Sequence, residues 1–145
     1  MTLIKPNINK LSQIYFLSSN YYFTNTNETI IEPFNIKNLS ANNIYEIEII
    51  LNVFQTYNSN WNIYVNSDTN ITSILVCNQY DTAIKILPIY TTNKVNIAQG
   101  STSMNIYYKC IIKNTTKFYI SYIDSLGGNY CYINKDYAFL KIKQI

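Results

Sequence analysis

The sequence predicts an all-β protein folded as an antiparallel β-sandwich or jelly roll. Its clearest segment, Ile44–Phe54, alternates apolar and polar residues at a period of two, the pattern of a strand with one buried face. No segment keeps a helical period beyond two turns, and β-branched residues dominate. Turn clusters of Asn, Ser and Thr recur at short intervals, as they do in sandwiches.

These alternating segments give the predicted strands. In chain order they are Gln13–Leu17, Tyr21–Thr24, Thr29–Phe34, Ile44–Phe54, Trp61–Val65, Ile71–Val76, Ala83–Tyr90, Met104–Ile112, Lys117–Asp124, Asn129–Ile133 and Ala138–Gln144.

The strand Ile44–Phe54 is expected to be the scaffold of the sandwich. Its inward face would carry Tyr45, Ile47, Ile49, Leu51 and Val53, and its outward face Glu46, Glu48 and Asn52. Each buried Ile or Leu stabilises the fold by about 1.5–3 kcal/mol. A slip of one residue would turn the apolar face to water, so the register is well specified.

Other strands differ in how many faces they bury. Met104–Ile112 also alternates, whereas Lys117–Asp124 has no clearly polar face and is expected to be covered on both sides. Pro88 predicts an edge or bulge in Ala83–Tyr90, and Pro33 is expected to end or kink its own strand, because proline cannot donate to a ladder.

Asparagine is expected to form most of the tight turns. The chain has only 3 Gly, and Asn tolerates positive φ while bonding its own backbone. Gly127-Gly128 reads as a hairpin turn. Asn66-Ser67-Asp68 predicts a turn that separates the strands Trp61–Val65 and Ile71–Val76.

The length of 145 residues predicts one sandwich domain over residues 13–145, preceded by an N-terminal docking arm over residues 1–12. Leu3, Ile4 and Ile8 are the candidate partner-docking residues of that arm. Charged residues make up 13% of the chain, about half of the usual share. A β-rich surface with so few charges favours a protein whose strand edges are hidden in an assembly.

Composition also argues against several functions. The chain has no His, and all 11 of its Lys+Arg residues are lysines. Without a base for a Ser or Cys nucleophile, and without a catalytic signature, we expect no enzyme and no cofactor. The lysines are scattered, which argues against nucleic acid as a partner. No apolar run reaches about 18 residues and no secretory leader is recognisable, so we expect neither a membrane span nor secretion.

No metal site is expected. Cys77, Cys110 and Cys131 are too far apart for zinc and too few without His, so they are predicted to be reduced, mostly buried thiols. Asp68-Thr69-Asn70 could belong to a calcium loop, but it lacks the Gly and the distal Glu of an EF-hand. An ordinary Asx-turn is the favoured interpretation.

Glu46 and Glu48 form the one close carboxylate pair, about 7 Å apart on one strand face. That separation resembles the separation in glycosidases. However, glycosidase carboxylates converge across a cleft, whereas these two share a strand. A solvated strand face is therefore the favoured interpretation.

The candidate ligand-binding residues are Tyr57, Asn58, Asn60, Trp61 and Tyr64. Aromatic rings stack on sugars and amides bond hydroxyls, so this composition would suit a carbohydrate or a glycosylated host receptor. In the alternative, favoured interpretation, Trp61 begins an inward row with Ile63 and Val65 and belongs to the core.

The 15 Tyr are too many for the core alone, and exposed tyrosines are typical of protein interfaces. The turn and long strand over Leu39–Ile49, the closing strand in Tyr137–Ile145 and the Asn/Ile/Tyr/Lys bias resemble small structural proteins of bacteriophages, especially the crAss-like group, with jelly-roll or TNF/C1q-like heads.

This resemblance implies a virion structural protein made in the host cytoplasm. The expected role is an auxiliary (decoration) capsid protein, and the alternative is a head- or tail-fibre module that binds carbohydrate or a receptor. The implied partners are capsid proteins or further copies of the chain, as a homo-oligomer with a trimer among the expected forms. The resemblance implies no catalytic residues.

Overall fold

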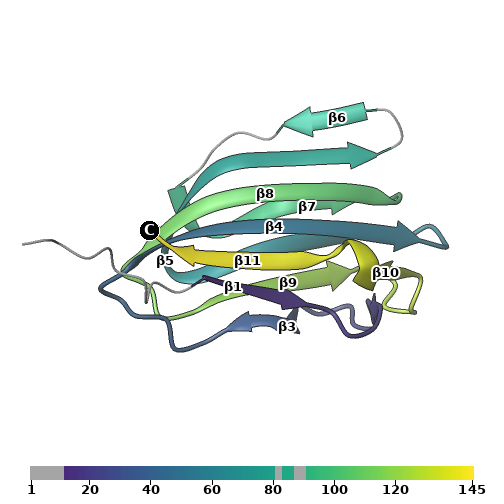
Figure 1. The fold of residues 1–145 in the computed structure, drawn as a ribbon. Helices are drawn as coiled ribbons and strands as arrows, with labels where there is room; N and C mark the ends of the chain where they lie inside the picture. Colours follow the sequence, from purple (N-terminus) through teal and green to yellow (C-terminus); the bar gives the residue numbers. More distant parts are fainter. Residues whose placement is uncertain (1–11, 81–82, 87–90) are drawn as a thin grey trace, which may run out of the picture.

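The computed structural model describes residues 12–80, 83–86 and 91–145, and these form the predicted all-β antiparallel sandwich (Figure 1). The described residues contain no α-helix, only one 3-10 turn. The elements are β1 (Ser12–Phe16), β2 (Tyr21–Tyr22), β3 (Thr29–Ile36), β4 (Ile44–Gln55), β5 (Trp61–Tyr80), β6 (Ala83–Ile86), β7 (Thr91–Gly100), β8 (Met104–Lys113), β9 (Phe118–Asp124), β10 (Cys131–Ile133), η1 (Lys135–Tyr137) and β11 (Phe139–Gln144).

The strands form two layers that share β5. The front layer has the order β1-β11-β4-β8 and continues into the second half of β5 (Figure 1). The back layer joins β3, β9, the first half of β5 and β7. Because β5 passes from one layer to the other, the sheet is a barrel-like sandwich that is nearly closed.

β5 corrects the prediction of two strands separated by a turn. Residues 61–67 pair with β9 and residues 71–79 pair with β8, and the strand changes layers between them. The polar residues at this bend have partners on neighbouring segments. Asn66 Nδ2 donates to Ser121 Oγ at 2.9 Å, and Ser67 Oγ hydrogen-bonds Thr115 Oγ1 at 2.7 Å. These bonds allow polar side chains to be buried where the sequence pattern predicted a turn.

Two elements of the structure are absent from the predicted set, and one predicted strand is described only in part. β7 was not predicted, because only Val95, Ile97 and Ala98 give it an apolar face. The 3-10 turn η1 was predicted neither as helix nor as turn; Asn134 caps it by accepting the N–H of Asp136. Of the predicted strand Ala83–Tyr90, residues 83–86 form β6, whereas Pro88 lies outside the described residues.

In the front layer, short strands follow one another along the same line. β10 and β11 both pair antiparallel with β4, at Val53–Gln55 and Tyr45–Ile50 respectively. Their partners β2 and β1 likewise lie in line. The turn η1 lies between β10 and β11 on the line next to β4, level with Leu51 and Asn52. On the β1 side of the front layer, four strand positions therefore lie side by side, at β1, β11, β4 and β8 (Figure 1), and beyond β8 the layer continues into β5 and β6.

The core lies between the layers and follows the predicted alternation. All five inward residues of β4 are buried, and their outward neighbours Glu46, Glu48 and Asn52 are partly exposed. β9 is largely covered on both faces, as predicted. The core includes Phe23, Trp61, Tyr108 and Tyr122, and the rings of Phe23 and Tyr122 stack with centroids 4.4 Å apart.

Asparagine supplies the left-handed turn positions, as predicted. Among the described residues, positive φ occurs at Asn38, Asn114 and Asn129, with values of 63°, 58° and 64°, and at Gly127. Pro33 stands where the β3–β9 register shifts between Ile30 and Asn35, so it kinks its strand without ending it. The predicted docking residues Leu3, Ile4 and Ile8 lie outside the described residues.

Candidate functional site

Trp61, the central residue of the predicted ligand site, belongs to the core. Its side chain is 0% exposed, and its Nε1 donates to Gln55 Oε1 at 3.0 Å. Gly100 of β7 lies against the indole so closely that a Cβ there would come within 2.6 Å of Cζ2. The indole face is therefore unavailable to a ligand, and the alternative interpretation of Trp61 as core is confirmed.

Tyr64 and Asn60 have different neighbours, and neither lines the pocket formed by Tyr57 and Asn58. The ammonium of Lys94 lies 4.5 Å from the Tyr64 ring centroid and also pairs with Glu28. The backbone N–H of Asn60 donates to Ser125 Oγ at 2.9 Å, next to the β9–β10 turn. Only two of the five predicted residues, Tyr57 and Asn58, line the same pocket.

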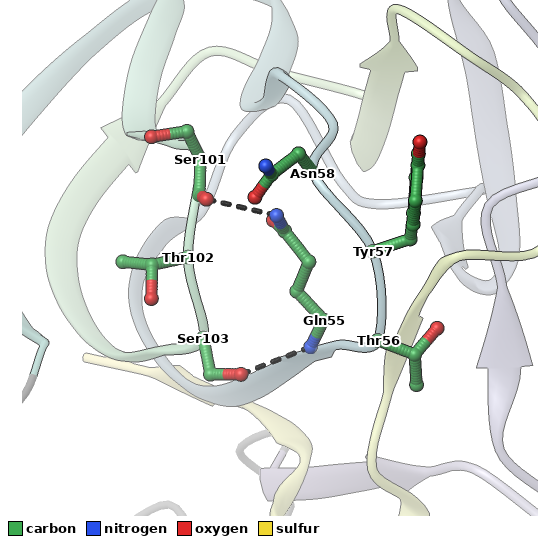
Figure 2. Close-up of a pocket in the computed structure, with 7 residues that line it drawn as sticks. All are labelled: Gln55, Thr56, Tyr57, Asn58, Ser101, Thr102 and Ser103. Atoms are coloured by element: carbon green, nitrogen blue, oxygen red, sulfur yellow. Dashed lines mark hydrogen bonds between the residues drawn. The ribbon is translucent and has the colours of Figure 1, made fainter.

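That pocket lies between the β4–β5 loop and the β7–β8 turn and has a volume of about 190 Å³. Gln55 crosses it, with its Nε2 donating to the Ser101 carbonyl at 2.8 Å and its backbone N–H to Ser103 Oγ at 3.0 Å (Figure 2). Its lining is almost wholly polar: Gln55, Thr56, Tyr57, Asn58, Ser101, Thr102 and Ser103. The volume is below the range of about 300–1,000 Å³ typical of drug-sized ligands.

The pocket offers free hydrogen-bonding groups but little aromatic surface. Within the described residues, the side chains of Asn58, Ser101 and Thr102 have no hydrogen-bond partner. Figure 2 shows the Tyr57 ring across the loop backbone from Ser101 and Thr102. It packs instead on Tyr130, with centroids 5.0 Å apart. The pocket can therefore bond hydroxyl groups, whereas the exposed aromatic pair lies beside it.

A larger surface that the sequence did not predict lies on the outer face of the front layer. Here the strand registers align apolar side chains in two rows. The apolar row, one residue from each of β1, β11, β4 and β8, is Phe16, Phe139, Ile50 and Tyr107. The aromatic row, from β2, β10 and β4, is Tyr22, Tyr132 and Phe54.

These rows expose apolar side chains to water, on a sheet face where polar side chains would be expected. Phe16 is 64% exposed, and Tyr22 and Phe54 are 45% and 43% exposed. In the aromatic row, Tyr132 packs between Tyr22 and Phe54 with centroid distances of 5.1 and 5.3 Å. Exposed apolar side chains gathered on one face in this way mark interaction sites in soluble proteins.

Beside the apolar row lie charged residues, and neighbouring strands carry charges of opposite sign. β11 carries Lys141 and Lys143, and the register places Glu48 and Glu46 of β4 beside them. Lys109 of β8 binds Glu46 at 3.3 Å. Burial and the negative charge of nearby Glu48 raise the pKa of the Tyr107 hydroxyl. The Glu46–Glu48 pair is thus part of a charged strand face, as favoured from the sequence.

The sequence contained part of this signal. Phe139, Lys141 and Lys143 were recognisable as one face of the last strand, and Glu46 and Glu48 as the outer face of β4. That β11 lies between β1 and β4 could not be inferred, because strand order depends on long-range pairing. The rows exist only once those strands are neighbours.

The buried thiols are unsuited to catalysis. Burial raises the pKa of Cys110 to about 12, an effect that its bond with Tyr108 reduces. For Cys131, burial and the charge of Asp124 raise the pKa to about 12, although a hydrogen bond with Ser59 lowers it in part. Nucleophilic cysteines need a lowered pKa, so both thiols act as small core residues.

Asp124 is a fully buried carboxylate with a structural role. Its Oδ1 accepts from Ser59 Oγ and, at 3.4 Å, from the N–H of Leu126, whereas Oδ2 has no hydrogen-bond partner. These bonds connect the β4–β5 loop to the β9–β10 turn. Buried polar groups are generally hydrogen-bonded, and here the bonds hold the two loops together.

The suggested calcium loop is occupied by internal bonds. Asp68 accepts from Thr115 Oγ1 and from the N–H and Oγ1 of Thr116, the latter at 2.6 Å. Desolvation raises the pKa of Asp68, but these bonds outweigh it and lower the pKa to about 2. Over the described ranges no three His, Cys, Asp or Glu side chains come together as metal ligands.

Comparisons of the chain with protein-family models, with curated proteins and with solved structures gave no significant match. Among the residues that the structure describes, no helix is long and apolar enough to cross a membrane.

Proposed function

We propose that the protein is a structural subunit of a larger protein assembly, with a virion as its setting and an auxiliary capsid protein as its role. The observation that carries this proposal is the outer face of the front layer, which exposes the apolar row and, on the far side of Asn52, the aromatic row. Aromatic side chains are enriched in protein interfaces and deliver large apolar contact at low entropic cost. The virion setting comes from the resemblance of the sequence to phage structural proteins.

The chemistry of the described residues supports a binding role over a catalytic one. The close carboxylates Glu46 and Glu48 share one strand face, Glu46 being paired with Lys109. The thiols of Cys110 and Cys131 have raised pKa values. In contrast, the front layer presents a broad, patterned surface that a neighbouring subunit could cover.

The test replaces exposed aromatic side chains on this face with lysine. A double variant, Phe16→Lys with Phe54→Lys, should lower occupancy in purified particles by about tenfold, because desolvating the new charges opposes docking. The tagged protein would be produced in the cells that carry its gene, and particles would be separated on a density gradient. Quantitative mass spectrometry would give the number of copies per particle.

The matched control is Leu126→Lys, which changes a side chain of similar exposure, 47%, in the turn between β9 and β10. It should leave occupancy unchanged. Unchanged occupancy of the double variant, or a wild-type protein that never sediments with particles, would contradict the proposal. Deletion of residues 1–10 tests the N-terminal docking arm separately: retention of full occupancy would show that the arm is dispensable.

A second candidate function, binding of a carbohydrate, is favoured by the polar pocket. Asn58, Ser101 and Thr102 present unpartnered polar side chains around a small opening, a suitable set for the hydroxyls of one sugar ring. A glycan array with the wild type, Asn58→Ala and the control Asn60→Ala tests it. Binding lost only in Asn58→Ala would support this function, and absence of wild-type binding would count against it.

A further inference from the structure

We propose that the occupant of the front face is a second copy of this chain, related by a two-fold axis that runs along the strands between β11 and β4. This inference rests on the proposed function, because it names the partner of the same face. Its basis is the strand register: β11 and β4 lie side by side, and their outward residues are complementary level by level. We use level for a set of register partners that lie side by side across the strands. A two-fold axis in that position places each level of one copy over the same level of the other.

At the level of the apolar row, this axis pairs apolar side chains only. Phe139 of one copy lies over Ile50 of the other, since the two residues are register partners on either side of the axis. One strand further out, Phe16 of β1 lies over Tyr107 of β8. Each of these contacts occurs twice, once on each side of the axis.

At the next two levels on the side away from Asn52, the same axis pairs opposite charges. Lys141 lies over Glu48 of the second copy, and Lys143 lies over its Glu46. Within the described residues of one chain, neither lysine takes part in an ion pair. Complementary charges of this kind select the partner and fix the register of an interface.

The aromatic row also meets itself. Phe54 lies over Tyr132 of the second copy, because these two are register partners across the same line. Between the aromatic and apolar rows, the exposed turn η1 stands at the level of Asn52 on the β11 side. The axis places this turn over Asn52 of the second copy, whose side chain is shorter than its aromatic neighbours and is held by Asn105.

Other two-fold axes in the face fit less well. An axis along β4 would place Glu48 over Glu48 of the second copy. An axis across the strands, centred on the apolar row, would place the aromatic row over the level of Lys143 and Glu46. An axis between β4 and β8 would pair Glu48 with Lys109, but it would place Glu46 over Ile111 and Lys141 over Leu75. Only the axis between β11 and β4 pairs both Lys141 and Lys143 with carboxylates.

The face is large enough for a stable dimer. Four strand positions about 4.8 Å apart and five levels about 6.8 Å apart cover roughly 650 Å² of each copy. The total of about 1,300 Å² lies within the range of about 1,200–2,000 Å² for standard interfaces. Face-to-face sheets of this kind pack with their strands about 30° apart, which the twist of each sheet accommodates.

The test uses exchanged charges at Lys141 and Glu48 and measures mass by sedimentation equilibrium of the purified full chain. The wild type should be a dimer. Lys141→Glu alone and Glu48→Lys alone each bring like charges together twice, so each should raise the dimer dissociation constant by at least about tenfold. An equimolar mixture of the two single variants should form heterodimers, because every facing pair is then opposite in charge. The double variant should again form homodimers.

Two controls separate the interface from folding. Lys117→Glu and Glu32→Lys change exposed charges outside the front face and should leave the wild-type dimer intact. Thermal melts show whether the single variants remain folded, since Lys141 and Glu48 are also neighbours within one chain. Recovery of the dimer in the mixture cannot arise from misfolded variants, so it supports the proposal directly.

A wild-type monomer at high concentration, or a dimer that neither single variant weakens, would overturn the inference. These outcomes differ from failure of the proposed function. A monomer that still loses particle occupancy through Phe16→Lys with Phe54→Lys would keep the docking role and remove the self-pairing. A charge-dependent dimer that never enters particles would keep the self-pairing and remove the structural role in a particle.

Discussion

At the scale of single residues, polar side chains in this protein mostly bond loops and strands together. Asp68 is the clearest case, because its exposed carboxylate holds the turn before β9 through Thr115 and Thr116. The sequence offered a calcium loop or an Asx-turn as the role of this residue. The structure assigns it a third role, in which the partners lie far away in the chain and could not be read from local spacing.

Asp68 gives a prediction about acid stability. Its pKa is lowered from 3.8 to about 2 in the folded state, so the carboxylate stabilises the fold above about pH 4. This contribution is lost as the pH falls from about 4 to 2. Asp68→Asn should therefore reduce the free energy of unfolding by about 1 kcal/mol at pH 7, a value limited by the solvent exposure of the site.

Urea denaturation at pH 7 and at pH 2.5 measures this effect. The difference between the wild type and Asp68→Asn should shrink at the lower pH. Asp136→Asn, on the exposed turn η1, is the matched control and should show no such change. An equal deficit of Asp68→Asn at both pH values would mean that the charge is not responsible.

At the scale of elements, β5 determines the shape of the sandwich. Its first half carries Trp61 into the core beneath β7, and its second half joins the front layer. Gly100 is the residue on β7 that makes room for the indole. The backbone of β7 approaches the indole so closely here that only glycine, which has no Cβ, fits without displacing it.

Gly100→Ala should destabilise the protein by about 1–3 kcal/mol, because Trp61 is enclosed and held by Gln55. Chemical denaturation measures the loss. A double-mutant cycle with Trp61→Phe should recover part of it, since the smaller ring leaves room for the methyl group.

Gly128→Ala is the matched control for this prediction. There a Cβ would meet the ring of Tyr130, which is 38% exposed and can move aside. Its cost should be smaller than that of Gly100→Ala. An equal cost at both positions would show that enclosure of the indole does not decide the effect.

At the scale of the whole molecule, the shared strand joins two layers into one folding unit. Neither layer has a complete core of its own, since the buried face of each is covered by the other. Trp61, on the part of β5 that belongs to the back layer, is the single Trp of the chain. Its fluorescence therefore reports on the back layer, whereas far-UV circular dichroism reports on the strands of both layers.

Unfolding should be a single cooperative transition. The urea curves followed by Trp61 fluorescence and by far-UV circular dichroism should coincide, because β5 cannot leave one layer without disrupting the other. Two separated transitions would show that the layers unfold independently. The measurement should use a protein concentration well below or well above any dimer dissociation constant, so that association does not distort the curves.

The sequence by itself determined the fold class, the buried face of β4, the role of asparagine in the turns and the preference for Trp61 as core. Each of these follows from local alternation or from the conformational preferences of one residue type. Tertiary structure decided the single long β5, the assignment of β7 and the alignment of Phe16, Phe139, Ile50 and Tyr107. Those features depend on which strands become neighbours, and pairing between distant segments has no local signal in the chain.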